Sequence, residues 1–264
     1  MTNSSIPTAF LLTLLAGLST GIGSLIAFMA SKTNKKFLCF SLGLSAGVMI
    51  YVSFMEMLPN GKQELVNSFG ERTGTLYLLL AFLAGMAMIT IIDFLVPESG
   101  NPHEMHGVEE MNVKDPLHRA GLVVALSIAI HNFPEGIATF TSALGSIDIA
   151  IPVTLAIAIH NIPEGIAVSV PVYHATGSKR KAFAYSFLSG LAEPAGALVA
   201  YLFLMPYWTP SVNGLVLSAV SGIMVFISLD ELLPSAEKYG EHHLSIAGLV
   251  TGMATIGLSL FLFA

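Results

Sequence analysis

Long apolar runs separated by short polar segments dominate the pattern of this 264-residue chain. An α-helix needs about 20 mostly apolar residues to cross a bilayer, and eight runs are long enough. They cover about residues 7–30, 38–59, 75–97, 119–144, 149–172, 182–205, 212–234 and 244–264. Because helices satisfy their own backbone hydrogen bonds in lipid, the pattern predicts an all-α membrane protein with eight transmembrane helices. We expect a single integral membrane transporter domain over residues 1–264, with one mobile, His-containing cytoplasmic loop at about 98–118.

Two pairs of these runs repeat each other in sequence. Val124–Ala138 matches Val153–Ala167 at 12 of 15 positions, and Gly47–Pro59 matches Gly222–Pro234 at 6 of 13. In each pair one copy crosses the membrane outward and the other inward. Such copies indicate an inverted repeat, a plan in which transporters place their binding site at the repeat interface. The pairing of the second run with the seventh, and of the fourth with the fifth, predicts a 3+2+3 inverted-repeat arrangement.

Composition and charge agree with this class and exclude others. The chain is 54% hydrophobic and only 11% charged, whereas soluble domains carry roughly 25% charged residues. Its 17 acidic and 11 basic residues give a net charge of −6, which argues against nucleic-acid binding. Cys39 is the only cysteine, so an intrachain disulfide and a cysteine zinc cluster are both excluded.

The distribution of Lys and Arg predicts the orientation in the membrane. With the N-terminus outside, nine basic residues fall near inner loops and only Lys62 and Arg72 fall near outer loops. Cytoplasmic loops of membrane proteins are enriched in Lys and Arg. Eight spans then leave both termini outside the cytoplasm. The nine inner basic residues are Lys32, Lys35, Lys36, Lys114, Arg119, Lys179, Arg180, Lys181 and Lys238.

Two nearly identical segments place polar side chains inside the fourth and fifth runs. They read HNFPEGIA at His131–Ala138 and HNIPEGIA at His160–Ala167, 29 residues apart. Ionisable side chains at such a depth are costly in lipid and mark ion pathways or relays. In each copy the His and the Glu are four residues apart and share a helix face. The duplication predicts two halves of one metal site at the membrane midplane.

The proline of each copy, Pro134 or Pro163, cannot donate a hydrogen bond to the carbonyl four residues earlier. We therefore expect both helices to kink there, with the freed carbonyls facing a cavity. Imidazole and carboxylate groups suit Zn²⁺ and neighbouring divalent ions, and two Glu charges would offset one such ion. A purely structural role is the competing interpretation. Two histidines, two asparagines and two glutamates in matched frames favour ligands.

The sixth run adds another carboxylate. Glu193 precedes Pro194, and no other charge lies between Lys181 and Asp230. Glu193 follows Glu164 by 29 residues, the same spacing as between the two motifs, which predicts a comparable depth. A buried carboxylate without a basic partner either binds a cation or is protonated. We interpret Glu193 as a ligand.

Matched residues in the second and seventh runs are less decisive. Glu56 and Glu231 occupy equivalent places in the repeat on opposite sides of the membrane, and they are either gate residues or interfacial acids. Met49 and its mate Met224 carry thioethers, which are weak ligands and more often fill gaps in packing. The loop histidines could catch or sense emerging metal, although solvated histidines are common in loops. These are His103, His106, His118, His242 and His243.

At the HNxPEG motifs the chain resembles the ZIP (Zrt/Irt-like) family of divalent-metal transporters, and within it the bacterial zinc-uptake permeases. The resemblance covers essentially the whole chain. It implies import of Zn²⁺, and often of Fe²⁺, Mn²⁺, Co²⁺ or Cd²⁺, into the cytoplasm across the bacterial inner (plasma) membrane. The metal is then a transported substrate and not a cofactor, and the protein is not an enzyme. Membrane lipid surrounds it, and a homodimer is compatible with the sequence.

The resemblance also implies a set of ligands. The family's primary site maps onto His131, Glu135, His160 and Glu164, with Met49 as a less certain contributor. A second, adjacent site maps onto Asn132, Asn161 and Glu193, with Glu135 and Glu164 bridging the two. Some relatives carry an acid where this chain has Asn161, so the second site is expected to be less negative here.

Two other functions share these residue types. An intramembrane metallohydrolase would also bury histidines and acids around a metal-activated water, but no His-Glu-x-x-His pattern is present. An efflux carrier would use the same ligands in the opposite direction. The sequence contains no Gly-x-x-x-x-Gly-Lys-[Ser/Thr] loop, so ATP hydrolysis by this chain is not expected.

Overall fold

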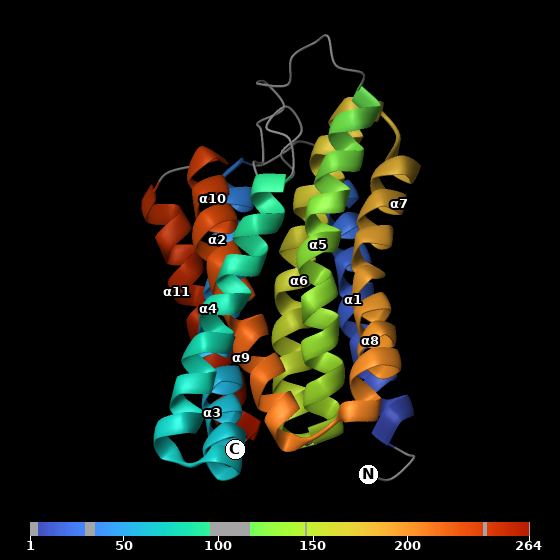
Figure 1. Ribbon diagram of the computed structural model, residues 1–264. Helices are drawn as coiled ribbons and strands as arrows, with labels where there is room; N and C mark the ends of the chain where they lie inside the picture. Colours follow the sequence, from blue (N-terminus) through green and yellow to red (C-terminus); the bar gives the residue numbers. More distant parts are fainter. Residues whose placement is uncertain (1–4, 30–34, 96–116, 146, 240–241, 264) are drawn as a thin grey trace.

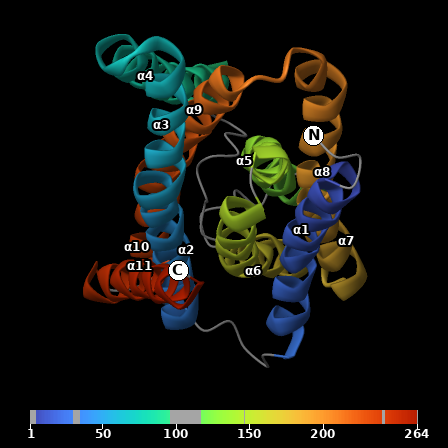
Figure 2. The ribbon, with the colours of Figure 1, turned by 90° about the horizontal axis from the view of Figure 1, so that it is seen from below.

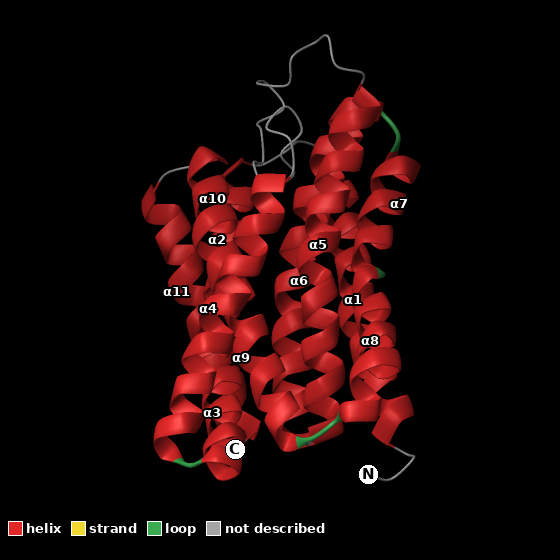
Figure 3. Ribbon diagram, in the orientation of Figure 1, coloured by secondary structure: helices red, strands yellow, loops and turns green. Residues whose placement is uncertain are grey.

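The computed structural model describes residues 5–29, 35–95, 117–145, 147–239 and 242–263, and all of its described elements are helices (Figures 1 and 3). The long helices run side by side between two ends. The start of α1 (Ser5–Met29) and the end of α11 (His242–Phe263) lie at one end, which we call the terminal end (Figure 1). At the other end α4 (Glu71–Leu95) stops and α5 (Leu117–Gly145) begins, and we call it the loop end.

Eight helical spans connect the two ends, as the hydrophobic pattern predicted. Seven meet the length and apolarity that a membrane crossing needs, and the remaining span, α5, is 29 residues long. Some spans are divided into shorter elements. In chain order the spans are α1 (Ser5–Met29), α2–η1–α3 (Lys35–Val52, Ser53–Met57, Leu58–Phe69), α4 (Glu71–Leu95), α5 (Leu117–Gly145), α6 (Ile147–Thr176), α7–α8–η3–η4 (Lys179–Gly190, Ala192–Val199, Ala200–Leu204, Met205–Tyr207), α9–η5–α10 (Pro210–Ile227, Ser228–Leu232, Leu233–Tyr239) and α11 (His242–Phe263).

Prolines distort the helices at places that the motifs did not indicate. Pro59, Pro206 and Pro234 each follow a five-residue π-helical turn, namely η1, η3 and η5. A proline lacks the N–H donor and clashes with the carbonyl four residues earlier, and a π turn absorbs both defects. By contrast, α5 and α6 continue as single helices through Pro134 and Pro163. π turns therefore occur in the second, sixth and seventh spans, and the kink expected at Pro134 and Pro163 stays a prediction.

The helices form two groups, seen end-on in Figure 2. One group holds α1, α5, α6 and the α7–α8 span, and the other holds α2–α3, α4, α9–α10 and α11. Within the first group α1 packs on α6 and α5 packs on α8. Within the second α2 packs on α11 and α4 packs on α9. Contacts of α2 with α6 and of α5 with α9 join the groups, so α5 and α6 lie in the middle of the molecule.

Close backbone contacts reveal the inverted repeat in three dimensions. Gly136 on α5 lies against the carbonyl of Glu193, and Gly165 on α6 lies against the carbonyl of Thr20. A methyl group at either glycine would overlap that carbonyl. The two glycines are equivalent in the HNxPEG copies. Their partners are equivalent if GLSTGIG (17–23) repeats as GLAEPAG (190–196). The first span is therefore the mate of the sixth, a relation that sequence comparison had not detected.

The outer helices obey the same rule. Gly47 on α2 lies against the carbonyl of Leu249 on α11, and its mate Gly222 on α9 lies against the carbonyl of Phe82 on α4. The third and eighth spans are thus mates as well. Together with the matched π turns η1 and η5, these contacts confirm the 3+2+3 arrangement.

Candidate metal centre

The two HNxPEG motifs meet where α5 and α6 cross the middle of the molecule. Helix α5 starts at the loop end, so His131 lies one turn nearer to that end than Glu135 (Figure 1). Helix α6 runs the opposite way, which reverses the order of His160 and Glu164. The histidine of each helix is therefore level with the glutamate of the other.

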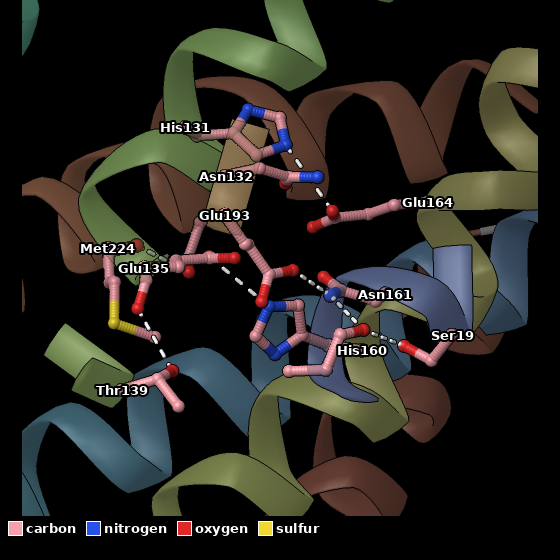
Figure 4. Close-up of polar contacts among 12 residues, drawn as sticks. Ser19, His131, Asn132, Glu135, Thr139, His160, Asn161, Glu164, Glu193 and Met224 are labelled. Atoms are coloured by element: carbon pink, nitrogen blue, oxygen red, sulfur yellow. Dashed lines mark hydrogen bonds and ion pairs between the residues drawn. The ribbon is translucent and has the colours of Figure 1, made fainter. Parts of the chain in front are cut away.

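This antiparallel arrangement creates two reciprocal His–Glu pairs (Figure 4). His131 Nε2 lies 3.4 Å from Glu164 Oε2, and His160 Nε2 lies 3.2 Å from Glu135 Oε1. All four side chains are at most 1% exposed. The sequence placed each His beside the Glu of its own helix, but the closest partners come from opposite helices. The site is thus built across the α5–α6 interface.

Three of these residues present ligand atoms to one point. One atom each from Glu135, His160 and Glu164 lie within 4.8 Å of one another. Zinc bonds to nitrogen and oxygen are about 2.1 Å long, so ligands of a tetrahedral ion are about 3.4 Å apart. Small side-chain rotations are enough to close that difference. An imidazole and two carboxylates form a suitable donor set for Zn²⁺ and similar ions.

Hydrogen bonds leave part of this centre unsatisfied. Among the residues that the structure describes, both ring nitrogens of His160 and both carboxylate oxygens of Glu135 are buried without a hydrogen-bond partner. The ion-pair contact of 3.2 Å between His160 Nε2 and Glu135 Oε1 joins these two side chains. Burying a carboxylate without compensation costs several kcal/mol, and a bound cation would supply that compensation.

The two motif asparagines tie the central helices to their neighbours. Asn132 Nδ2 donates to the carbonyl of Ser189 at 3.4 Å, and Asn161 Nδ2 donates to the carbonyl of Ala16 at 3.0 Å. Ala16 and Ser189 each immediately precede the repeated glycine of the first and sixth spans, so the two ties are equivalent. The asparagines therefore have a structural role whether or not they also bind metal.

Glu193 joins the centre through only one of these amides. Asn161 Nδ2 also donates to Glu193 Oε1, whereas Glu193 Oε2 and Asn161 Oδ1 are buried without a hydrogen bond (Figure 4). Glu193 is fully buried at the start of α8. The carboxylate and the amide oxygen together provide two oxygen acceptors next to the reciprocal pairs, as the predicted second site requires.

Glu231 is a neighbour of the centre that the sequence left undecided. Its Oε2 lies 3.7 Å from His131 Nδ1, and its side chain is 3% exposed. The π turn η5 carries it toward α5. Its repeat mate Glu56 is only half-buried and accepts a hydrogen bond from Asn60 on its own span. In both copies of the repeat the glutamate lies three residues before a proline, and this shared spacing could have identified Glu231 from the sequence.

Two methionines at equivalent positions of the repeat, Met49 and Met224, are fully buried. Met224 on α9 lies on the same side of the centre as Glu135 and Thr139 (Figure 4). Met49 is its repeat mate and is fully buried in α2. Ser45, one turn earlier on α2, lies beside Glu164. Met49 is therefore on the helix face that approaches α6, and its role as a ligand stays a prediction.

Two of the five loop histidines have side chains within the described part of the chain, and these lie apart from this centre. His103 and His106, with most of the predicted loop at 98–118, and the side chain of His118 lie outside the described residues. His242 and His243 begin α11 and are exposed at the loop end.

Comparison with known proteins places the chain in a defined group. A family described as "ZIP Zinc transporter" matches residues 1–93 and 97–260. "Zinc transporter ZupT" of Streptococcus mutans is 60% identical over 97% of this chain and 97% of the relative. The proteins of that name from Clostridium perfringens and Oceanobacillus iheyensis are 58% and 57% identical, over 97% of this chain and at least 95% of each relative. The similarity therefore extends over the spans, both motifs and the surrounding helices.

Proposed function

Because the chain belongs to the ZIP family of zinc transporters, we propose that it imports divalent metal ions, chiefly Zn²⁺, across the bacterial cytoplasmic membrane. Fe²⁺, Mn²⁺, Co²⁺ and Cd²⁺ are further candidate substrates. The family consists of transporters, so the chain is not an enzyme and the metallohydrolase alternative is set aside. The observation that carries this function is the buried pair of reciprocal His–Glu contacts across α5 and α6.

We assign the primary metal site to His131, Glu135, His160 and Glu164. The short contacts and complete burial of these four side chains support the assignment. Two carboxylates carry two negative charges and offset the charge of one M²⁺ ion. The ion in turn removes the cost of leaving them unpaired in a water-poor interior. Met49 is an additional thioether contributor on the α2 side.

An adjacent second site uses Asn132, Asn161 and Glu193, with the glutamates of the primary site bridging. The buried oxygens of Asn161 and Glu193 support this assignment most directly. Asn132 already donates to a backbone carbonyl, so its contribution comes through its amide oxygen. Several weak positions in succession suit transport, because a conducting site must bind its ion and also release it.

The levels of the ligands suggest a route through the centre. Glu135 faces His160, and His131 faces Glu164. Glu164 links the two pairs, because it contacts His131 and also presents an oxygen to the cluster that it forms with Glu135 and His160. Glu231 extends the His131 level toward α9. An ion can therefore exchange one ligand at a time between neighbouring carboxylates and imidazoles, without regaining its full hydration shell in between.

The loop end faces the cytoplasm in this proposal. The excess of Lys and Arg near the loops at that end supports this orientation, and it leaves both termini outside. Entry of a divalent ion down a 100 mV inside-negative potential then releases about 4.6 kcal/mol, twice the value for a single charge. This free energy is enough to drive uptake at low external metal without ATP.

Zinc flux into sealed vesicles that hold a zinc-sensitive dye tests the proposal. Wild-type protein should admit Zn²⁺, whereas Glu135→Gln and Glu164→Gln should reduce the flux to that of protein-free vesicles while the purified proteins stay monodisperse. Glu71→Gln is a matched control, because Glu71 is an exposed carboxylate paired with Lys62 at 3.1 Å far from the centre. Wild-type flux in either central variant would refute the site.

Direction needs a second measurement. Cells that express the chain should accumulate more zinc from a dilute medium than cells that express Glu164→Gln. Lower cellular zinc in the wild-type cells would instead identify an efflux carrier with the same ligands.

A further inference from the structure

A second group of metal-binding side chains lies at the loop end, apart from the central site. Glu237 is in the last turn of α10, and His242 and His243 are the first two residues of α11. His242 Nδ1 lies 2.6 Å from Glu237 Oε1, and the rings of His242 and His243 have centroids 5.7 Å apart. All three side chains are exposed. A dissolved ion can therefore reach them directly.

The contact with Glu237 prepares His242 to bind a metal. A carboxylate on Nδ1 fixes the imidazole tautomer in which Nδ1 carries the proton and Nε2 keeps its lone pair. Histidines that ligate metals commonly donate their other ring N–H to a carboxylate in this way, which also makes the ring more basic. His242 Nε2 is thus available as a ligand atom.

His243 is close enough to supply a second ligand. Two imidazoles on one tetrahedral zinc ion, with Zn–N bonds of about 2.1 Å, have ring centroids about 5 Å apart. The observed 5.7 Å is near this value, and an exposed ring needs only a small rotation to reach it. Water molecules would complete the coordination, so binding is expected to be reversible and weaker than at a closed four-ligand site.

The position of this group relates it to the central site. α10 continues directly from η5, which carries Glu231 beside His131. Glu237 follows Glu231 by six residues, and a helix rises about 1.5 Å per residue, so the two carboxylates are about 9 Å apart along the span. The surface group therefore lies about two turns beyond Glu231 on the same span, toward the loop end.

We propose that Glu237, His242 and His243 form a surface site for Zn²⁺ and similar divalent transition-metal ions, which holds the ion where it leaves the transport path. The inference rests on the proposed function for the identity of the ion and for the route by which it leaves. The central ligands play no part in forming the surface site, so the two can be tested separately.

Zinc protection of the histidines against diethyl pyrocarbonate tests the site on the full-length protein. Modification of His242 and His243 is read by mass spectrometry as ZnCl₂ is added, with MgCl₂ as a cation that imidazole binds poorly. Zinc should protect both residues and magnesium neither. Loss of a carboxylate that orients a ligand typically weakens metal binding 10- to 100-fold, so Glu237→Gln should require at least about 10-fold more zinc for equal protection.

Two variants distinguish binding at this site from a general effect of zinc and from binding at the central site. Glu71→Gln, which removes an exposed carboxylate elsewhere, should leave the protection unchanged. Glu135→Gln should abolish zinc flux and still show full protection of His242 and His243. Equal modification of both histidines with and without zinc would overturn the proposal, as would an unchanged zinc requirement in Glu237→Gln. Full zinc protection of His242 and His243 in a Glu135→Gln protein without flux would support the surface site. Normal flux in Glu135→Gln would refute the central site and not the surface site.

Discussion

At the scale of single residues, equivalent positions of the repeat have different surroundings. Asn132 and Asn161 both donate to a backbone carbonyl, and Asn161 also donates to the buried carboxylate of Glu193. Glu231 reaches His131, whereas Glu56 is held by Asn60 on its own span. The repeat specifies which residues are available, and local packing determines which of them meet the centre.

The difference between the asparagines leads to a prediction. Asn161→Asp should keep transport but change its rate or its preference among Zn²⁺, Fe²⁺ and Cd²⁺, because a second carboxylate beside Glu193 makes this part of the centre more negative. Tighter binding would also slow release of the ion. Uptake of each metal by the variant and the wild type measures the effect.

Asn132→Asp is the matched comparison. It replaces a donor to the Ser189 carbonyl with an acceptor and so removes a buried hydrogen bond, at a cost of about 0.5–1.5 kcal/mol. It should lower thermal stability and reduce uptake of all three metals to a similar extent. An Asn161→Asp variant with an unchanged metal profile would show that Asn161 does not touch the ion.

At the scale of helices, glycines and prolines position the centre. The glycine of each HNxPEG motif brings a neighbouring backbone into direct contact with α5 or α6. The prolines of the second and seventh spans each follow a π turn, and each π turn carries a glutamate. These features determine how closely helices approach and where their side chains point.

Replacement of the motif glycines should destabilise the protein. In Gly165→Ala the new methyl group would overlap the carbonyl of Thr20, and such overpacking typically costs about 1–3 kcal/mol. We expect a lower melting temperature in detergent and a loss of zinc uptake. Gly21→Ala on α1 is a milder control, because its methyl group would meet side-chain ring carbons, of Phe187 at 3.3 Å and of Phe183 at 3.8 Å, and no backbone carbonyl among its three nearest atoms. Equal stability of Gly165→Ala and the wild type would contradict the close packing of α6 on α1.

The π turn η5 allows a test of function without loss of folding. Pro234→Ala restores a backbone donor and removes the clash that favours the π turn, so the helix can relax toward α-helical geometry. The helix should become as stable or more stable, while Glu231 rotates away from His131 and zinc uptake falls. Pro210→Ala is the control, since proline is readily tolerated in the first turn of a helix, where Pro210 begins α9. Normal uptake by Pro234→Ala would show that the position of Glu231 does not matter.

At the scale of the whole molecule, the sequence predicted much of the architecture. The long apolar runs gave the eight spans, and the duplicated motifs gave the pairing of the two central helices. The match between the first and sixth spans was not predicted, because GLSTGIG and GLAEPAG share only two glycines and one leucine. It became clear only when Gly136 and Gly165 were seen against equivalent carbonyls.

The site was predictable by residue type but not by pairing. A buried His and Glu four residues apart indicate a ligand face, and the sequence identified all four side chains of the reciprocal pairs. Which His lies beside which Glu depends on the offset between two antiparallel helices, and that offset is set by packing against α1 and α8. The π turns were likewise not predicted, because a proline in a helix can produce a kink, a π turn or a smooth helix according to its neighbours.

The orientation of the molecule can be checked directly. Alkaline phosphatase, which folds to an active enzyme only outside the cytoplasm, should be active when fused behind the C-terminus. The same enzyme fused after Ser178, between α6 and α7 at the loop end, should be inactive. The Lys and Arg bias of the loops is the physical reason for this expectation. The reverse pattern of activities would place the termini in the cytoplasm.

The reciprocal His–Glu pairs also bear on the reversibility of transport. A pseudo-twofold axis in the membrane plane relates the two pairs, so an ion meets the same imidazole and the same carboxylate from either face. The two pairs themselves carry no polarity. Their unequal neighbours, Glu231 beside His131 and Glu193 beside Asn161, affect how tightly the ion is held and not which compartment it favours. The direction of net flow is then set by the zinc concentrations and the voltage on the two sides. A cell that lost its membrane potential while rich in free zinc would leak the metal through the same four side chains that gathered it.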